Sequence, residues 1–405
     1  MDRSSQLEKV NILSLNGDFD TSFNKGHAIS YGIEGTLNNV RSNAYSQNII
    51  INGSAISDLG PKKNIPTRYP SDGSSYKSFA MYVNWIWNMN EFFTFNAGTR
   101  LTYTGLRAKW NESASINAQL STFSLNSSAL TSTLSMTLRP SKKFQLMTVL
   151  SSGFRNPNID DIGKIRENNG ILVVPNTFLK PEYAYNLDLG MNFKSLNNLN
   201  HVSFRTFATV ISRHIVRDDF IIFSDTTTAD ESTILYNGEE VNTIANKNLG
   251  NRFIHGFSID GFSYFSKSLK FTGSISYVQG DENETYGPMP SISPIFGTIS
   301  GEYSKNKFRV SALYKFSGDK SPGDYSLGGE DGLEETPEII ESNGLIKYTG
   351  TPKWSDFSIY TNYDISQDVK VRFALTNIFD NHYRSFASGI SAPGRSFQIG
   401  LYLKL

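Results

Sequence analysis

The chain of 405 residues contains no cysteine. Disulfide bonds and thiolate metal sites are therefore excluded, although this absence does not identify a cellular compartment. A net charge is absent too, because 38 lysines and arginines balance 38 aspartates and glutamates. A chain without a basic excess has no global field that attracts nucleic acid, so we expect no nucleic-acid partner.

Long apolar runs are also missing. No run of eighteen apolar residues occurs in the sequence, and this excludes a transmembrane helix. The first twenty residues are polar and pass directly into an alternating pattern, without the apolar core of a secretory signal. If the protein is exported, we expect this chain to be only part of the precursor.

Alternation of apolar and polar residues recurs along nearly the whole chain. Most of the alternating segments have ten or more residues, about twice the length of an ordinary strand. We count about fifteen of them, at roughly 8–19, 27–38, 75–89, 92–106, 128–139, 143–154, 182–194, 199–214, 252–265, 268–279, 294–304, 307–317, 353–364, 368–379 and 396–405. The pattern predicts an all-β fold with unusually long strands.

The two faces of these segments differ in a consistent way. Between Tyr183 and Phe193 every second residue is apolar, and the intervening residues are small or polar. Such a strand suits a sheet with lipid on one side and water on the other. Aromatic residues also gather near strand ends, as at Trp85 and Trp87, where a membrane barrel places its aromatic girdles.

The connections between segments alternate between short and long. Turns of a few residues alternate with loops at about 39–74, 107–127, 155–181, 215–251, 280–293, 318–352 and 380–395. An up-and-down antiparallel barrel of the outer-membrane type has one trimmed rim and one elaborated rim. Because the last loop is long and thus external, we expect the final strand to run inward and the C-terminus to be periplasmic.

Two separated motifs resemble those of TonB-dependent outer-membrane receptors. GFRNPNIDDIG at Gly153–Gly163 precedes PNTFLKPEYAYNLDLGMNF at Pro175–Phe193, each at a predicted junction of strand and loop. The end of the chain is similar to that family as well, with Asn377–Asp380 and then Pro393–Arg395 before the last strand. The resemblance covers roughly residues 151–405, and the first 150 residues agree in pattern only.

The resemblance implies a barrel of 22 strands, closed by an N-terminal plug and energised through contact with TonB. About fifteen strands, an odd number, and no recognisable plug are present, so we expect residues 1–405 to be the C-terminal portion of such a barrel. The expected location is the outer membrane of a Gram-negative bacterium, with lipid and the barrel assembly machinery as further partners. Leu405 stands where the family usually ends in phenylalanine, which assists recognition by that machinery.

The resemblance also suggests where a small-molecule ligand would bind. Arg155 and Asn156 follow the top of a strand, and Arg384 and Arg395 flank the last external loop. An arginine can bind a siderophore carboxylate or a phosphate bidentately. The alternative is that these motif residues only fix their loops or contact the plug.

Ligand choice is expected to depend on the long loops at 215–251 and 318–352. These loops contain many polar groups, together with Tyr236, Tyr325 and Tyr348. The leading interpretation is an active importer of a scarce nutrient, such as a siderophore or a cobalamin-like compound. Haem and oligosaccharides remain as other ligands, and a passive porin, an adhesin barrel or a soluble β-rich binding protein as other classes.

Few residues indicate a metal site or catalysis. The five histidines include no pair at ligand spacing, and none lies between Asn156 and Lys180, where haem importers of the resembled family place an axial histidine. We interpret isolated histidines such as His214 as barrel-wall residues. The acidic run at 329–341 lacks the pattern of a calcium loop, and no nucleophile or metalloprotease motif occurs. We therefore expect no cofactor, no metal and no enzyme activity.

Overall fold

The computed structural model describes residues 2–23, 26–53, 55–65, 67–110, 122–163, 165–168, 170–221, 233–236, 239–283, 287–327 and 329–404. Leu405, the terminal residue discussed above, lies outside them. Fifteen long strands form the wall of the molecule: β1 (Asp2–Phe23), β2 (His27–Asn52), β5 (Ser74–Asn88), β6 (Phe93–Lys109), β7 (Thr122–Ser141), β8 (Phe144–Arg155), β11 (Glu182–Lys194), β12 (Asn200–Asp219), β14 (Glu239–Tyr264), β15 (Leu269–Gly280), β18 (Phe296–Lys305), β19 (Phe308–Ser317), β22 (Trp354–Asp364), β23 (Val369–Thr376) and β24 (Ser396–Leu403). All fifteen correspond to predicted segments.

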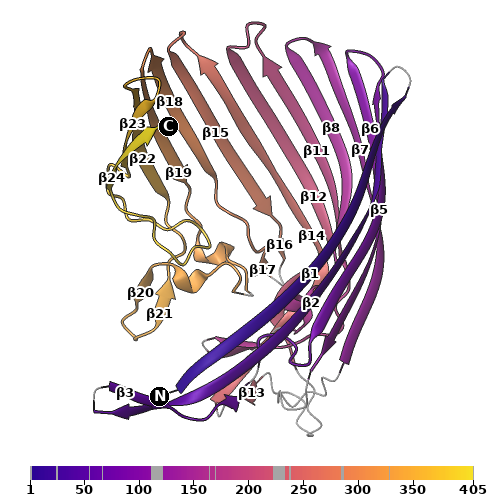
Figure 1. Cartoon of the computed structure of the whole chain (residues 1–405), viewed down its shortest axis with the longest axis vertical. Helices are drawn as coiled ribbons and strands as arrows, with labels where there is room; N and C mark the ends of the chain where they lie inside the picture. The colour runs from indigo at the N-terminus through magenta and orange to yellow at the C-terminus, as the bar shows by residue number, and fades with distance from the viewer. Residues whose placement is uncertain are drawn as a thin grey trace.

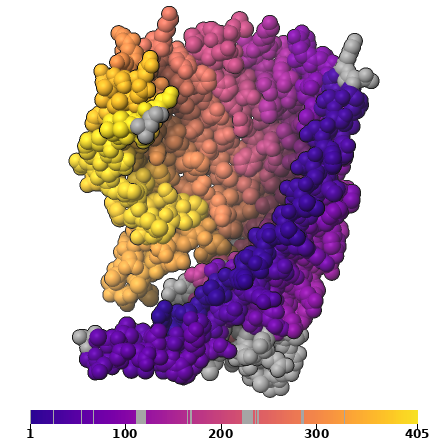
Figure 2. Space-filling model, in the orientation of Figure 1, coloured from indigo at the N-terminus to yellow at the C-terminus, as the bar shows by residue number. Residues whose placement is uncertain are grey.

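Each long strand pairs in antiparallel fashion with the next long strand in the chain. The result is a single curved up-and-down wall (Figure 1). Among the described residues no pairing joins β1 to β24. Figure 2 shows the molecule hollowed between the indigo N-terminal strand and the yellow C-terminal strands.

The apolar face of the wall points outward. In β24 the alternating residues Phe397 and Leu403 are 64% and 61% exposed. In β11 the exposed positions are likewise the apolar ones, including Leu189, whereas Asp188 beside it is half-buried on the inner face. A soluble sheet would hide its apolar face in a core, so this arrangement is typical of a wall that contacts lipid. No helix in the described ranges is both long and apolar enough to cross a bilayer.

The two rims differ as predicted, with tight turns at one end and long loops at the other (Figure 1). The loops contain α1 (Ile159–Gly163), the 3₁₀ turns η1 (Pro322–Asp324) and η2 (Leu333–Glu335), and the short strands β3 (Ala55–Leu59), β4 (Lys63–Asn64), β9 (Arg166–Asn168), β10 (Ile171–Val173), β13 (Thr233–Tyr236), β16 (Glu282–Asn283), β17 (Gly287–Pro288), β20 (Glu338–Ile340) and β21 (Ile346–Tyr348). β24 runs toward the short-turn rim, so the C-terminal end of the wall lies on that side.

Three predicted loops are in part long strand, and to that extent the predicted boundaries were wrong. β6 and β7 are paired as far as Lys109–Thr122, inside the predicted loop at 107–127. β1 and β2 stay paired without interruption from Phe23–His27 to Asp2–Asn48, although residues 39–52 were assigned to a loop. β12 and β14 likewise extend into the predicted loop at 215–251. Beyond the wall both faces of a strand meet water or other loops, so the apolar alternation that identifies a wall strand fades.

The buried apolar residues of the described chain gather mainly in the loops. One cluster, which we call the α1 cluster, contains Leu106, Ala108, Trp110, Ile159, Ile162, Leu179 and Ile215. A second contains Ile165, Leu172, Val174, Val241 and Ala245. The elaborated rim therefore has a packed interior of its own.

Candidate functional site

The first motif folds the loop after β8 by itself. Asn158 accepts hydrogen bonds at Oδ1 from the backbone of Asp160 (2.8 Å) and of Asp161 (3.0 Å), and so caps the start of α1. The Asp161 carboxylate accepts the Arg155 guanidinium at 2.5 Å and the Asn158 backbone N–H at 2.9 Å. Asn156 is 8% exposed and accepts the Ser127 hydroxyl at 2.6 Å. These contacts fix the loop after β8 onto the long-loop rim of the wall.

The second motif connects this loop to the extended ends of β12 and β14. Asn176 donates to the carbonyl oxygen of Asn246 at 2.7 Å, and Asn246 in turn donates to the carbonyl oxygen of Asp161 at 3.0 Å. Lys180 and Asn248 exchange two hydrogen bonds, of 2.7 and 3.0 Å. These hydrogen bonds hold together residues that are 68 to 85 positions apart, and they fix α1 against β14.

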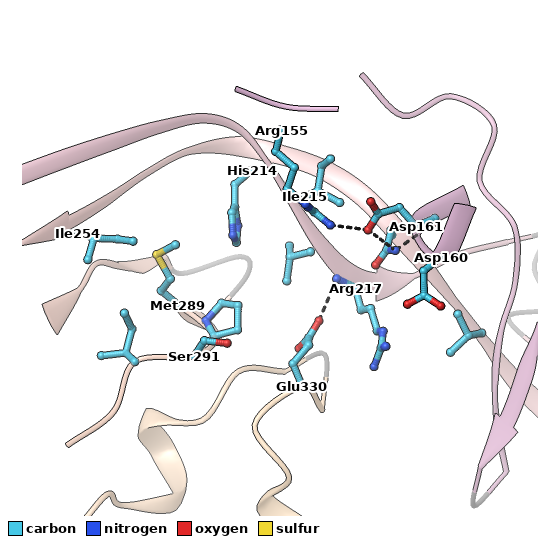
Figure 3. A pocket seen from close by; sticks show the side chains of 15 residues that line it. Arg155, Asp160, Asp161, His214, Ile215, Arg217, Ile254, Met289, Ser291 and Glu330 are labelled. Atoms are coloured by element: carbon cyan, nitrogen blue, oxygen red, sulfur yellow. Dashed lines mark hydrogen bonds and ion pairs between the residues drawn. The ribbon is translucent and has the colours of Figure 1, made fainter. Parts of the chain in front are cut away.

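A cavity of about 430 Å³ lies where these segments meet (Figure 3). The strands β8, β10, β12 and β14, the helix α1 and two further loops contribute to it. Its lining consists of Arg155, Asp160, Asp161, Val173, His214, Ile215, Val216, Arg217, Asn246, Ile254, Met289, Pro290, Ser291, Ile292 and Glu330. A concave site with apolar walls and a few converging polar groups is the usual form of a ligand site.

Charged groups of both signs line the cavity. Arg155 is engaged by Asp161, as described above, and its side chain is 44% exposed. Glu330 accepts the backbone N–H of Arg217 at 3.1 Å and the hydroxyl of Ser326 at 3.0 Å. Figure 3 shows the Arg217 side chain extending beside Glu330. The guanidinium groups of Arg155 and Arg217 are the two positive groups that a bound anion could meet here.

His214 also lines the cavity, from the part of β12 beyond the wall. It is 7% exposed, and its Nδ1 atom has no hydrogen-bond partner in the described structure. Burial lowers the pKa of His214 to about 4, and the neighbouring cations Arg252 and Arg155 act in the same direction. The imidazole is therefore neutral at pH 7. His214 ends the segment predicted at 199–214 and is on a strand as expected, but its place in the cavity was not predicted, because β12 continues beyond it into the predicted loop at 215–251.

A buried ion pair holds the two loops that close the cavity. Lys320 lies 3.8 Å from the Asp331 carboxylate, with side chains 5% and 2% exposed. Lys320 also donates to the carbonyl oxygen of Ile292 at 2.5 Å, and Asp331 accepts the backbone N–H of Ser291 at 2.7 Å. Because Ser291, Ile292 and Glu330 all line the cavity, the ion pair fixes the position of its closing side.

Of the seven residues predicted from the sequence to contact a ligand, Arg155 is the one that lines this cavity. Asn156 is buried beside it. Tyr325 is 3% exposed and bonds through its hydroxyl to the Thr351 hydroxyl at 2.6 Å, so it lies inside the loop rather than on its surface. Tyr236 packs beside the second apolar cluster.

The remaining three predicted residues lie on other loops of the long-loop rim. Tyr348 ends β21 and is partly exposed. Arg384 donates to the carbonyl oxygen of Glu335 at 2.6 Å, and Arg395 is exposed, with its backbone N–H bonded to Asp380 at 2.7 Å. The structure thus does not bring the seven residues into one site.

The acidic run at 329–341 is partly structural. Glu330 and Asp331 face inward to the contacts described above, and Glu335 pairs with Arg384 at 3.6 Å. In the described part of the chain, no group of three histidines or carboxylates could hold a metal ion. The residues that sequence reasoning missed, Asp161, His214, Arg217, Met289 and Glu330, come together only through the folding of distant loops.

Comparison with known proteins gives a consistent result. The family model "TonB dependent receptor-like, beta-barrel" matches residues 2–378. Among solved structures, the copper transporter OprC superposes with a TM-score of 0.72 at 14% identity, covering 98% of this chain and 57% of that one. No curated protein sequence matches the chain.

Two further structures have the same fold. The siderophore receptor PiuA from Acinetobacter baumannii gives a TM-score of 0.65 at 13% identity over 99% of this chain and 56% of that one. The hemophore receptor HasR of Serratia marcescens, solved with its hemophore HasA and heme, gives 0.67 at 13% identity, with coverage of 99% and 59%. The chain spans a little more than half the length of these structures.

Proposed function

The chain belongs to the family of TonB-dependent receptor β-barrels, and on that premise we propose that it is part of a receptor that imports a siderophore or a cobalamin-like nutrient with energy supplied through TonB. The observation that carries the proposal is the match of the family model to residues 2–378. The family consists of transport receptors of the Gram-negative outer membrane rather than enzymes. We accordingly propose transport and no catalysis for this chain.

We propose that the chain is the C-terminal portion of a barrel of about 22 strands. The unpaired edges of β1 and β24 support this, since an open edge in lipid leaves backbone groups without partners. The coverage of 57% of the OprC structure supports it as well. A plug, the contact with TonB and the entry of the ligand would then involve polypeptide outside this chain. If the long loops are external, the short-turn rim and the C-terminus face the periplasm.

The external cavity is the proposed ligand site, with Arg155 and Arg217 as contacts for an anionic group. Apolar residues such as Ile215 and Ile254 line the same cavity, and the partial exclusion of water there strengthens charge-assisted hydrogen bonds. At about 430 Å³ the cavity suits part of a siderophore or a small chelate rather than a large glycan. Tyr348, Arg384 and Arg395 remain proposed contacts for the outer part of the ligand.

Binding to the folded chain in detergent tests this proposal. The probes are a ferric tris-catecholate, a ferric hydroxamate and cyanocobalamin, and the readout is quenching of tryptophan fluorescence, since Trp110 lies in the α1 cluster with Ile215 of the cavity wall. We expect one probe class to bind and the variant Arg217→Gln to bind it about tenfold more weakly, the usual loss for a hydrogen bond to a charged group.

The matched control is Arg309→Gln, a change of the same charge at the short-turn rim, and it should leave the affinity unchanged. Equal weakening by both variants would refute the cavity as the site. If none of the three probes bound the folded chain, the proposed ligand class would be wrong. A copper ion or haem would then be the next probe, because neighbours with the same fold are described with those cargoes.

A further inference from the structure

One polar side chain of the external cavity is buried without a hydrogen-bond partner. His214 is 7% exposed, and its Nδ1 atom is closed off from solvent and bonds to no described residue. Buried polar atoms in folded proteins nearly always have a partner, so an unpartnered one calls for an explanation. Figure 3 shows the imidazole projecting into the same space as the side chains of Arg155 and Met289. The ring therefore lies at the proposed ligand site without serving the fold.

The backbone of β12 is distorted next to this ring. Regular alternation would put His214 on the same face as Val210, which is 42% exposed. Arg213, between them, instead has a left-handed backbone with a φ of 58°, which is unfavourable for a residue other than glycine. The alternation is broken there, and His214, Ile215 and Val216 are buried in succession. All three line the cavity.

The second sequence motif supports this distortion. Asn248 of β14 donates to the carbonyl oxygen of Arg213 at 2.8 Å, and it also exchanges two hydrogen bonds with Lys180 of the motif. A strained backbone persists only where its surroundings hold it, and such strain is common at ligand sites. The motif thus contributes to holding the His214 imidazole in the cavity.

The buried Nδ1 atom decides which ring nitrogen carries the proton. A buried N–H group without an acceptor is rarer in proteins than an acceptor without a donor, so the proton of the neutral ring belongs on Nε2. Because Nδ1 is closed off, Nε2 is also the nitrogen that a molecule in the cavity can reach. Burial, with Arg252 and Arg155 nearby, lowers the pKa of His214 to about 4. The ring is therefore a neutral donor at pH 5.5 and above.

The carboxylates around the ring already have partners in the protein. The charged groups that face His214 or share its cavity are Arg155, Asp160, Asp161, Glu182, Arg217, Arg252, Asp281 and Glu330. The donors to the carboxylates are Tyr69 for Asp160, Arg155 for Asp161, the Ile215 backbone for Glu182, Arg252 for Asp281 and the Arg217 backbone for Glu330. What the cavity offers to a ligand is thus a set of donors, namely the His214 ring and the two guanidinium groups.

We propose that His214 is a specificity-determining residue of the external cavity, and that its Nε2–H group donates to an anionic oxygen of the ligand beside the Arg155 guanidinium. The inference rests on the proposed function, because it places the ligand in that cavity. An ionised carboxylate, which only accepts hydrogen bonds, suits these donors, whereas a neutral amide also presents N–H groups to them. The cavity should therefore prefer siderophores with ionised carboxylates to the amide-rich surface of a cobalamin-like compound.

The test uses the full chain folded in detergent, with 4-fluorobenzoate as the probe. Its carboxylate is ionised at both pH 7.5 and pH 5.5, and 4-fluorobenzamide is the neutral probe of the same shape. Broadening of the fluorine resonance reports binding. We expect 4-fluorobenzoate to bind more tightly than the amide, and with the same affinity at both pH values, because the donor is neutral at both. His214→Phe should weaken its binding about tenfold, the loss for one hydrogen bond to a charged group.

Two amide variants identify the donating nitrogen. Glutamine places its amide nitrogen near the position of Nε2, and asparagine places it near that of Nδ1. His214→Gln should therefore keep the affinity within about twofold, because the donor is retained. His214→Asn should lose as much affinity as His214→Phe. The matched control, His382→Gln in the last external loop, should leave the affinity unchanged.

Several outcomes would overturn the inference. Equal affinity of the wild type and His214→Phe would do so, as would binding retained by His214→Asn and lost by His214→Gln. Binding that tightens about tenfold from pH 7.5 to pH 5.5 would mean that the ring acts as a cation. Equal binding of the two probes would exclude a site for an anion.

Failure of the cavity as the ligand site gives a different result. Arg217→Gln would then bind 4-fluorobenzoate as well as the wild type does, and the inference would fall together with the proposed site. If Arg217→Gln weakens binding and His214→Phe does not, the cavity stands and the role of His214 alone is refuted.

Discussion

The two rims of the wall differ in how far they bury their charged and apolar side chains. At the long-loop rim, distant loops bury apolar clusters and enclose the ion pair of Lys320 and Asp331 almost completely. At the short-turn rim, the described turns pack no such cluster, and the charged side chains stay accessible, as in the pair of Lys370 and Asp364, each 46% exposed. One rim is stabilised from within, whereas the other leaves its charges exposed.

This difference follows from loop length. A turn of two to five residues can only connect its strands, whereas a long loop can fold back and bury side chains of its own. Burial makes the apolar clusters and the Lys320–Asp331 pair of the long-loop rim costly to break, whereas an exposed pair such as Lys370–Asp364 contributes little.

Lys320→Met should destabilise the long-loop rim most. The substitution leaves the Asp331 carboxylate, 2% exposed, without its cation, and removing one partner of a buried pair costs about 3–5 kcal/mol. Hydrogen exchange should therefore accelerate in residues 287–292 and 329–335. The double variant Lys320→Met/Asp331→Asn should recover part of the loss. Unchanged exchange in the single variant would show that the pair does not hold these loops.

Ile162→Ala tests the α1 cluster. Ile162 is fully buried there, and truncation of a buried isoleucine costs about 2–5 kcal/mol. We expect the emission of Trp110, now 5% exposed, to shift to the red as the cluster loosens. The control is Phe92→Ala at the short-turn rim, where the side chain is 51% exposed. A shift of equal size in the control would remove the contrast between the rims.

His214 should make the long-loop rim sensitive to acid. The pKa of His214 in the folded chain is about 4, below its ordinary value of 6.5. Below pH 6.5 the unfolded loop takes up a proton that the folded loop does not. The contribution of His214 to the free energy of unfolding is therefore fully present above pH 6.5. It is lost as the pH drops toward 4, by about 3 kcal/mol in all.

Trp110 emission or hydrogen exchange between pH 7.5 and pH 4.5 measures this effect. The variant His214→Phe should lose most of the dependence, whereas His382→Gln in the last external loop should keep it. An identical pH profile for the wild type and His214→Phe would mean that another group is responsible.

Lys370→Met should have the smallest effect. Lys370 lies 3.2 Å from Asp364 at the short-turn rim, but both side chains are 46% exposed. Exposed pairs of this kind contribute less than about 1 kcal/mol. Thermal unfolding in detergent should therefore hardly change. A loss comparable to that of Lys320→Met would contradict the assignment of weak, exposed charges to this rim.

The wall was predictable from the sequence for a physical reason. Lipid on one face and water on the other force an alternation that every wall strand repeats, as the segment from Tyr183 to Phe193 does. The short and long connections then determined which ends lie together. The two motifs were also informative, because their own side chains fold the loop: Asn158 caps α1, and Arg155 holds Asp161.

The external cavity was not predictable in the same way. Its residues come from six separate stretches of the chain, and nothing local in the sequence relates His214 to Met289 or Glu330 to Arg217. The choice of tyrosines and arginines in the long loops followed composition alone, and composition does not distinguish the buried Tyr325 from the exposed Arg395. The extensions of β12 and β14 beyond His214 and Leu249 were missed because alternation fades outside the lipid-facing wall.

The central claim is that the apolar face of the wall contacts lipid while the polar face encloses the interior. The absence of cysteine allows a direct test, with single variants Leu189→Cys and Asp188→Cys labelled with an environment-sensitive fluorophore in bilayers that contain brominated lipid. We expect strong quenching of the label at position 189 and weak quenching at position 188. Equal quenching at both positions, or stronger quenching at position 188, would contradict it.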